Sequence, residues 1–137
     1  MNTINSGKAF DKFIELVKKQ NGDVSYIKDT NKFEKAKYSI EIIVEEDGYV
    51  KELKAEEVGK IAMKLGAGRI KKEDRIDMQA GVLLNKKVGD YCRKGEILAS
   101  LYTNDENKLE NAENEFKKSI IIAKEKQEKP NMILEII

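Results

Sequence analysis

The first candidate for chemistry is the tetrad Gly66–Arg69, in which two glycines free backbone amides and an arginine could fork onto a phosphate. Phosphate-binding loops usually precede a helix, whose positive amino-terminal end faces the anion. This tetrad instead follows a predicted helix and faces its negative end. We therefore interpret it as a structural turn in which Gly66 or Gly68 has a positive φ. Arg69 would then pair with a nearby carboxylate: Glu73, Asp74 or Asp77.

Lys64 is the second candidate, because Ala62-Met63-Lys64-Leu65 superficially matches the tetrapeptide whose lysine carries biotin. The later sequence GDYCRKGEILA, residues 89–99, also has the strand pattern of biotinyl and lipoyl carrier domains. Carriers present their lysine at a hairpin tip after that strand, whereas Lys64 precedes it and falls in a predicted amphipathic helix. We favour an exposed helical lysine, with a free-standing carrier or protein-interaction module as the alternative function.

Carboxylates and the single cysteine offer little further chemistry. Paired acids occur at Glu45-Glu46-Asp47, Glu56-Glu57 and Glu73-Asp74, but no nucleophile, apolar wall or metal partner accompanies them. The chain has no histidine, and Cys92 cannot form an internal disulfide or a metal site by itself. We interpret Cys92 as a small, partly buried strand residue. The sequence thus predicts no catalytic, cofactor-binding or metal-ligating residue, and no cofactor.

Composition narrows the class of protein. A length of 137 residues suits one domain with a helical appendage, and the net charge is only +1. Basic residues are spread through every segment, which argues against a nucleic-acid partner. No apolar run approaches the roughly 18 residues that span a bilayer, and the amino terminus lacks the apolar core of a signal peptide. We expect a cytoplasmic protein without a membrane partner.

An amino-terminal helix is predicted over Gly7–Lys19, with Ser6 as its cap and Asn21-Gly22 as its stop. Its apolar residues share one face at helical spacing: Phe10, Phe13, Ile14 and Val17. Such a stripe needs a partner surface, either the domain that follows or another part of a larger protein. An irregular connector, Asp23–Phe33, should come next.

The rest of the chain alternates predicted strands and helices. In chain order they are strands Lys37–Glu45 and Tyr49–Leu53, helix Ala55–Leu65 ended by Gly66, strands Ile76–Leu84, Asp90–Cys92 and Ile97–Tyr102, a long helix to about Lys124, and a strand Met132–Ile136. Thr103, Asn104 or Asp105 should cap the long helix. Its buried stripe should comprise Leu109, Ala112, Phe116, Ile120 and Ala123. This order predicts an α+β fold.

The most specific stretch is residues 48–104, which reads GYVKELKAEEVGKIAMKLGAGR, then KEDRID, then KKVGDYCRKGEILASLYTN. It resembles the C-terminal domain of pyrimidine nucleoside phosphorylases, the family that includes thymidine phosphorylase. The resemblance runs from about Asn5 to the end, with Cys92 and Lys64 standing where the family usually has apolar residues. It implies an α/β-hammerhead, a barrel-sandwich-hybrid-like domain over residues 35–137, preceded by a helix and connector over residues 1–34.

The resemblance also implies a function for a larger enzyme. Members of this family catalyse the reversible attack of inorganic phosphate on the anomeric carbon of uridine or thymidine, and are homodimers whose domains close over the substrates. Their phosphate-binding loops and pyrimidine-binding side chains precede the part seen here, so no catalytic residue can be carried over. We therefore expect a scaffold domain that is inactive and monomeric alone, and whose partner is the missing N-terminal catalytic portion of the same enzyme.

Overall fold

The computed structural model describes residues 2–130. The chain divides into two compact units, one ending at Lys35 and one beginning at Ala36. The predicted strand Met132–Ile136 lies outside the described residues. Among the helices of residues 2–130, none is long and apolar enough to cross a membrane.

The first unit is helical. Its elements are α1 (Asn2–Asn5), α2 (Lys8–Lys19), α3 (Ser25–Lys28) and the 3₁₀ turn η1 (Thr30–Lys32). The predicted helix stop is confirmed: Asn21 has a φ of 60°, and the Gly22 amide donates to the Val17 carbonyl at 2.9 Å. The predicted cap is wrong. Ser6 donates its hydroxyl to the Thr3 carbonyl at the end of α1, and Gly7 occupies the N-cap position without a side-chain hydrogen bond.

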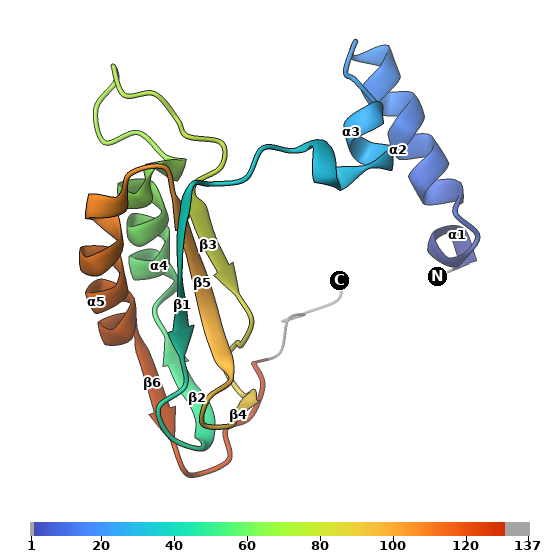
Figure 1. Ribbon diagram of the computed structural model, residues 1–137. Helices are drawn as coiled ribbons and strands as arrows, with labels where there is room; N and C mark the ends of the chain where they lie inside the picture. Colours follow the sequence, from blue (N-terminus) through green and yellow to red (C-terminus); the bar gives the residue numbers. More distant parts are fainter. Residues whose placement is uncertain (1, 131–137) are drawn as a thin grey trace. The chain divides into compact units, whose positions relative to one another are not determined.

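Up to residue 130, the second unit contains two antiparallel sheets and two α-helices (Figure 1). Its elements are β1 (Tyr38–Ile43), β2 (Gly48–Leu53), α4 (Ala55–Ala62), the π-helical turn η2 (Met63–Ala67), β3 (Gly81–Leu84), β4 (Tyr91–Cys92), β5 (Ile97–Thr103), the 3₁₀ turn η3 (Glu106–Lys108), α5 (Leu109–Ser119) and β6 (Ile120–Ala123). The strand orders are β1-β5-β3 and β4-β2-β6. The predicted α+β class is confirmed, and the finer hammerhead arrangement stays a prediction.

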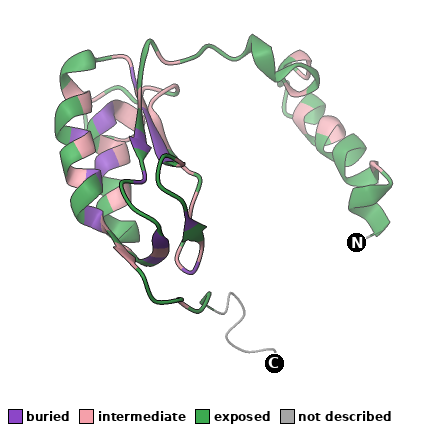
Figure 2. Cartoon of the chain, turned by 60° about the horizontal axis from the view of Figure 1, so that its bottom comes forward, coloured by how far each residue is buried: buried purple, intermediate pink, exposed green. Residues whose placement is uncertain are grey.

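One apolar core joins these elements. The helices α4 and α5 lie side by side against the strands, and Figure 2 shows buried positions on both helices and on the strands. Leu101 of β5, Ile61 of α4 and Phe116 of α5 are at most 1% exposed. Burial of such side chains contributes roughly 1.5–3 kcal/mol each. The core therefore fixes the two helices, and the loop that follows α4, against the sheet β1-β5-β3.

Two predicted elements are wrong in extent. Only Gly81–Leu84 of the predicted strand Ile76–Leu84 pairs, with β5, because hydrogen bonds to Asp77 hold the preceding residues in a loop. The long helix ends at Ser119, and Ile120–Ala123 forms β6 on the edge of β2. Three consecutive isoleucines are β-branched and favour this extended backbone over a helix. Ile120 and Ala123 therefore do not belong to the stripe of α5.

Candidate functional site

The 66–80 loop, which joins η2 to β3, contains the residues that the sequence selected. It begins in the last residues of the π-helical turn η2, where Gly66 has a φ of 127°. The buried Thr103 hydroxyl donates to the Leu65 carbonyl at 2.8 Å, which ties this turn to the end of β5. The Asp77 amide donates to the Gly66 carbonyl at 2.8 Å, so the loop closes on its own first residue.

Asp77 and Asn104 form the centre of the loop. The Asn104 Nδ2 atom donates to both Asp77 carboxylate oxygens, at 3.1 and 2.9 Å, and to Gln79 Oε1 at 2.7 Å. The Asn104 Oδ1 atom accepts from the Lys37 amide at 2.9 Å, at the start of β1. The Asp77 carboxylate also accepts from the Gln79 amide at 3.0 Å. These contacts make Asp77 a structural anchor and leave it poorly placed to act as a base.

The two glycines of the tetrad have different roles. Gly66 has the predicted positive φ, whereas the φ of Gly68 is −147°, which is extended backbone. A Cβ on Gly68 would approach Met63 Cγ at 2.9 Å, and a Cβ on Gly66 would approach Asp77 Cβ at 3.1 Å. Gly66 is therefore needed for its conformation, and Gly68 for the close packing of the loop on η2.

The predicted pairing of Arg69 with a carboxylate is wrong. Within residues 2–130, Arg69 forms no salt bridge with Glu73, Asp74 or Asp77. The Asp74 carboxylate instead accepts from the amides of Ile70 and Lys71, at 3.0 and 2.8 Å. Asp74, one of the three acids expected to pair with Arg69, is thus engaged by short-range hydrogen bonds from the backbone.

A pocket of about 250 Å³ lies beside this loop. Its lining comprises Met63, Lys64, Gly66, Gly68, Ile70, Asp74, Arg75 and Lys108. Lys64 is paired across to α5, with its Nζ atom 2.6 Å from Glu115 Oε1, and this contact lowers the pKa of the Glu115 carboxyl. Basic side chains and the Asp74 carboxylate line the pocket, and its lining includes no cysteine or serine that could act as a nucleophile.

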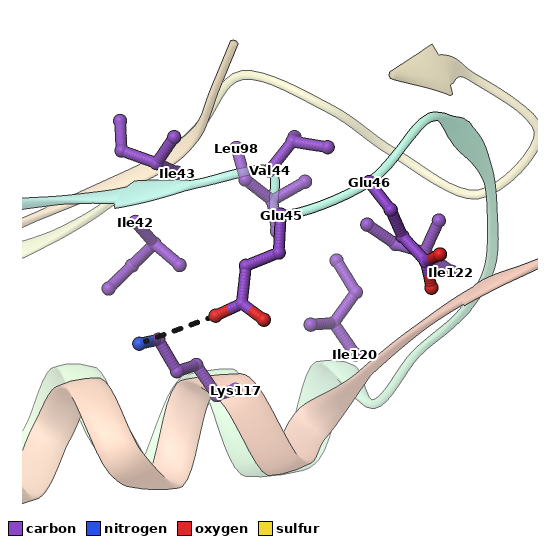
Figure 3. A pocket seen from close by; sticks show the side chains of 9 residues that line it. All are labelled: Ile42, Ile43, Val44, Glu45, Glu46, Leu98, Lys117, Ile120 and Ile122. Carbon is purple, nitrogen blue, oxygen red and sulfur yellow. Dashed lines mark ion pairs between the residues drawn. The ribbon is translucent and has the colours of Figure 1, made fainter. Parts of the chain in front are cut away.

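A second pocket, of about 210 Å³, lies between the end of β1, β5 and β6 (Figure 3). Aliphatic side chains line it: Ile42, Ile43, Val44, Leu98, Ile120 and Ile122. Figure 3 shows Glu45 reaching toward Lys117, and their charged atoms are 3.8 Å apart. The three strands are distant in sequence, so no local motif could have predicted this pocket. It has no pair of groups arranged for acid-base chemistry.

Several of the other acidic candidates have structural partners. Glu56 and Glu57 lie in the first turn of α4, as predicted, and both contact Lys60. Asp47 accepts from the Lys94 amide at 2.7 Å, at the turn before Gly95. Over residues 2–130 no cluster of three or more histidine, cysteine, aspartate or glutamate side chains could hold a metal ion.

Cys92 and Lys64 complete the set of candidates. Cys92 is fully buried in β4, not partly buried as predicted, and burial raises the pKa of its thiol. Lys64 lies in the turn at the end of α4, and it precedes in sequence the glycines Gly89 and Gly95 that flank β4. Its side chain bridges two helices and is not at a hairpin tip, where a carrier domain presents its lysine.

Comparison with known proteins gives a consistent set of relatives. The family model described as "Pyrimidine nucleoside phosphorylase C-terminal domain" matches residues 49–123. Pyrimidine-nucleoside phosphorylase from Bacillus subtilis is 49% identical over 102 residues, which are 74% of this chain and 24% of that protein. The protein of the same name from Staphylococcus epidermidis is 39% identical over 143 residues, which cover 100% of this chain and 31% of that protein. The chain thus spans less than a third of the length of these curated relatives, 24% of one and 31% of the other.

Proposed function

This chain belongs to the pyrimidine nucleoside phosphorylase C-terminal domain family, and from that membership we propose that it serves a larger enzyme that cleaves pyrimidine nucleosides with phosphate. The observation that carries the proposal is the extent of the family match. Residues 49–123 include all of β2 except Gly48 and every later element through β6, together with the 66–80 loop. Similarity over most of the second unit, and not over one motif, supports the assignment.

The proposed reaction is the reversible phosphorolysis of uridine or thymidine. A phosphate oxygen forms a bond to the anomeric carbon, the bond from that carbon to the base nitrogen breaks, and the base leaves with the electron pair and takes up a proton. The products are the free base and a pentose 1-phosphate. The described part of this chain offers no side chain arranged for these steps, so we place the catalytic and substrate-binding groups in the remaining part of the enzyme.

The proposed contribution of this chain is mechanical. A body with one apolar core and two sheets can move as a unit when domains close over two substrates. Closure of this kind accelerates a reaction between two substrates by positioning them and excluding water. We propose a homodimeric enzyme in the cytoplasm, in which residues 1–34 connect the domain of residues 35–137 to the catalytic portion. The isolated chain should be an inactive monomer.

We propose a structural role for Gly66, Gly68 and Asp77 within that body. The hydrogen bonds from Asn104 to Asp77, and the close approach of Gly68 to Met63, support a loop built for shape. The carrier alternative has no support among the relatives, which are named as phosphorylases. The ion pair between Lys64 and Glu115 also favours a structural lysine over a modified one.

A chimera tests the proposed function. In the Staphylococcus epidermidis relative, the stretch that aligns with this chain would be replaced by the whole of this chain. The replacement is straightforward because the alignment covers 100% of this chain. We expect the chimera to release uracil from uridine in phosphate buffer, at a rate within about tenfold of the parent. The parent truncated before the aligned stretch is the control, and it should be inactive. A folded chimera with no more activity than the truncated parent would contradict the proposal.

A further inference from the structure

Among its described residues, the first unit has no buried side chain. Every residue from 2 to 35 is exposed or of intermediate burial, and Figure 2 shows only those two classes on α2. Phe10 and Phe13 are each 49% exposed, although α2 carries both on one face with Ile14 and Val17. We call these four residues the α2 face. Within the described residues, Ile14 and Val17 are of intermediate burial, so the α2 face is apolar and only partly covered.

The helix that carries this face is nevertheless well defined by its sequence. Its end is fixed by the hydrogen bonds from Asn21 and Gly22 to the carbonyls of Lys18 and Val17. Its polar side is suited to water, with Glu15 paired to Lys12 and Lys19. A unit of about 35 residues without a disulfide or a metal rarely buries enough surface to fold alone. We therefore expect another part of a protein to pack against the α2 face.

The size of the face argues against a second copy as that partner. A helix of 12 residues is about 18 Å long, so a stripe about 10 Å wide covers roughly 200 Å². Stable interfaces bury about 800 Å² on each partner. The α2 face alone would thus bury about a quarter of the area that a stable dimer needs on each partner. An area of this size is compatible with a helix that packs against other parts of a longer chain.

The curated relatives indicate which chain that is. The Staphylococcus epidermidis protein aligns with 100% of this chain but uses only 31% of its own length to do so. The first unit therefore has a counterpart in a protein of which about two-thirds lies outside the aligned stretch. We propose that the α2 face packs against that additional part of the phosphorylase. The inference rests on the proposed function and names the surface by which the domain is joined to the rest of the enzyme.

Two matched double variants test this inference. Phe10→Ser with Phe13→Ser removes the apolar face, and Lys8→Ser with Lys18→Ser makes the same number of changes to serine at exposed, polar positions of α2. Each pair would be made in the chain alone and in the chimera described above. The readouts are the melting temperature, the sedimentation of the chain alone, and the uridine phosphorolysis of the chimera.

We expect the phenylalanine variant to lower the melting temperature of the chimera by more than about 5 °C, because two buried rings are lost. The lysine variant should change it by less than about 2 °C. In the chain alone, both variants should melt as the unmodified chain does. Equal melting of the two chimeric variants would overturn the inference, and so would a dimer of the chain alone that only the phenylalanine variant dissociates. An unmodified chimera without activity would contradict the proposed function, while the melting comparison would still decide the role of the α2 face.

Discussion

At the scale of single residues, Asp90 shows how side-chain contacts hold the chain that follows β6. Its Oδ1 atom is 2.6 Å from Lys129 Nζ, and its Oδ2 atom accepts from the Lys87 amide at 2.9 Å. Gly89, beside it, lies so close to Lys129 that a Cβ there would approach Lys129 Cγ at 2.7 Å. The turn at Gly89-Asp90 therefore also holds in place the chain that follows β6.

These contacts predict how stability depends on pH. The hydrogen bond from Lys129, and then that from the Lys87 amide, lower the pKa of Asp90 below its ordinary value of 3.8. A carboxyl whose pKa is lowered by folding stabilises the fold above its unfolded-state pKa, and this contribution is lost as the pH falls through its folded-state pKa. Asp90→Asn should therefore lower the melting temperature at pH 7 and flatten its decline below about pH 4.

Melting curves between about pH 2 and pH 7 would check this prediction. Lys129→Met is the matched control, because it removes the principal cause of the lowered pKa and keeps the carboxyl. It should reproduce part of the flattening. The size of the effect should be small, since Lys129 is largely exposed to solvent. An acid decline that is identical in all three proteins would show that Asp90 does not contribute to it.

At the scale of elements, the glycines of α4 and η2 separate two physical effects. Gly59 lies inside α4, and a Cβ there would meet no atom within 4 Å. Gly59→Ala should raise the free energy of unfolding by roughly 0.5–1 kcal/mol, because alanine loses less backbone entropy in a helix. Gly66→Ala should lower it by about 1–3 kcal/mol, because a φ of 127° strains any residue with a Cβ.

Urea denaturation of the two variants beside the unmodified chain would test this pair. The same chemical change, seven residues apart, is expected to have opposite signs. If Gly66→Ala were as stable as the unmodified chain, η2 would not require the conformation described here, and the path of the 66–80 loop would need another explanation.

Elements also show how far local sequence can predict this fold. The end of α2, the start of α4 and the positive φ of Gly66 follow from short-range rules, and the structure confirms them. Ile120–Ala123 continues the apolar spacing of α5, but its place beside β2 depends on residues about 70 positions earlier, such as Val50 opposite Ile122. The spacing of apolar residues alone could not distinguish helix from strand for Ile120–Ala123. The pairing with β2 makes this segment a strand.

The same limit applies to the candidate site. Asn104 is 27 residues from Asp77, and the sequence offered it only as a possible helix cap. Its hydrogen bonds with Asp77 arise because β5 ends beside the 66–80 loop, which is a property of the sheet. Arg69 was expected to pair with nearby acids because they are close to it in sequence. In the structure, the Asp74 carboxylate instead accepts hydrogen bonds from two backbone amides that are also close in sequence. Local rules predicted some short-range features, such as the end of α2, but they did not predict which group Asp74 binds, and they could not predict contacts between elements.

At the scale of the whole molecule, the two units differ in what holds them. The second unit has a continuous apolar core, and the family match lies entirely within it, at residues 49–123. The first unit has no buried residue among those described, and it carries the α2 face. The proposed enzyme gives both observations one explanation: the second unit is the folded domain, and the first joins it to the catalytic portion.

The most direct test of this account is an assay of uridine and thymidine phosphorolysis by the purified chain alone, beside the Staphylococcus epidermidis relative and the chimera. The account predicts no release of free base by the chain alone above the rate in buffer, together with activity in the other two proteins. Release of base by the chain alone, in proportion to its concentration, would contradict the account. It would mean that a complete site lies within these 137 residues, and the pocket beside the 66–80 loop would be the first place to search for it.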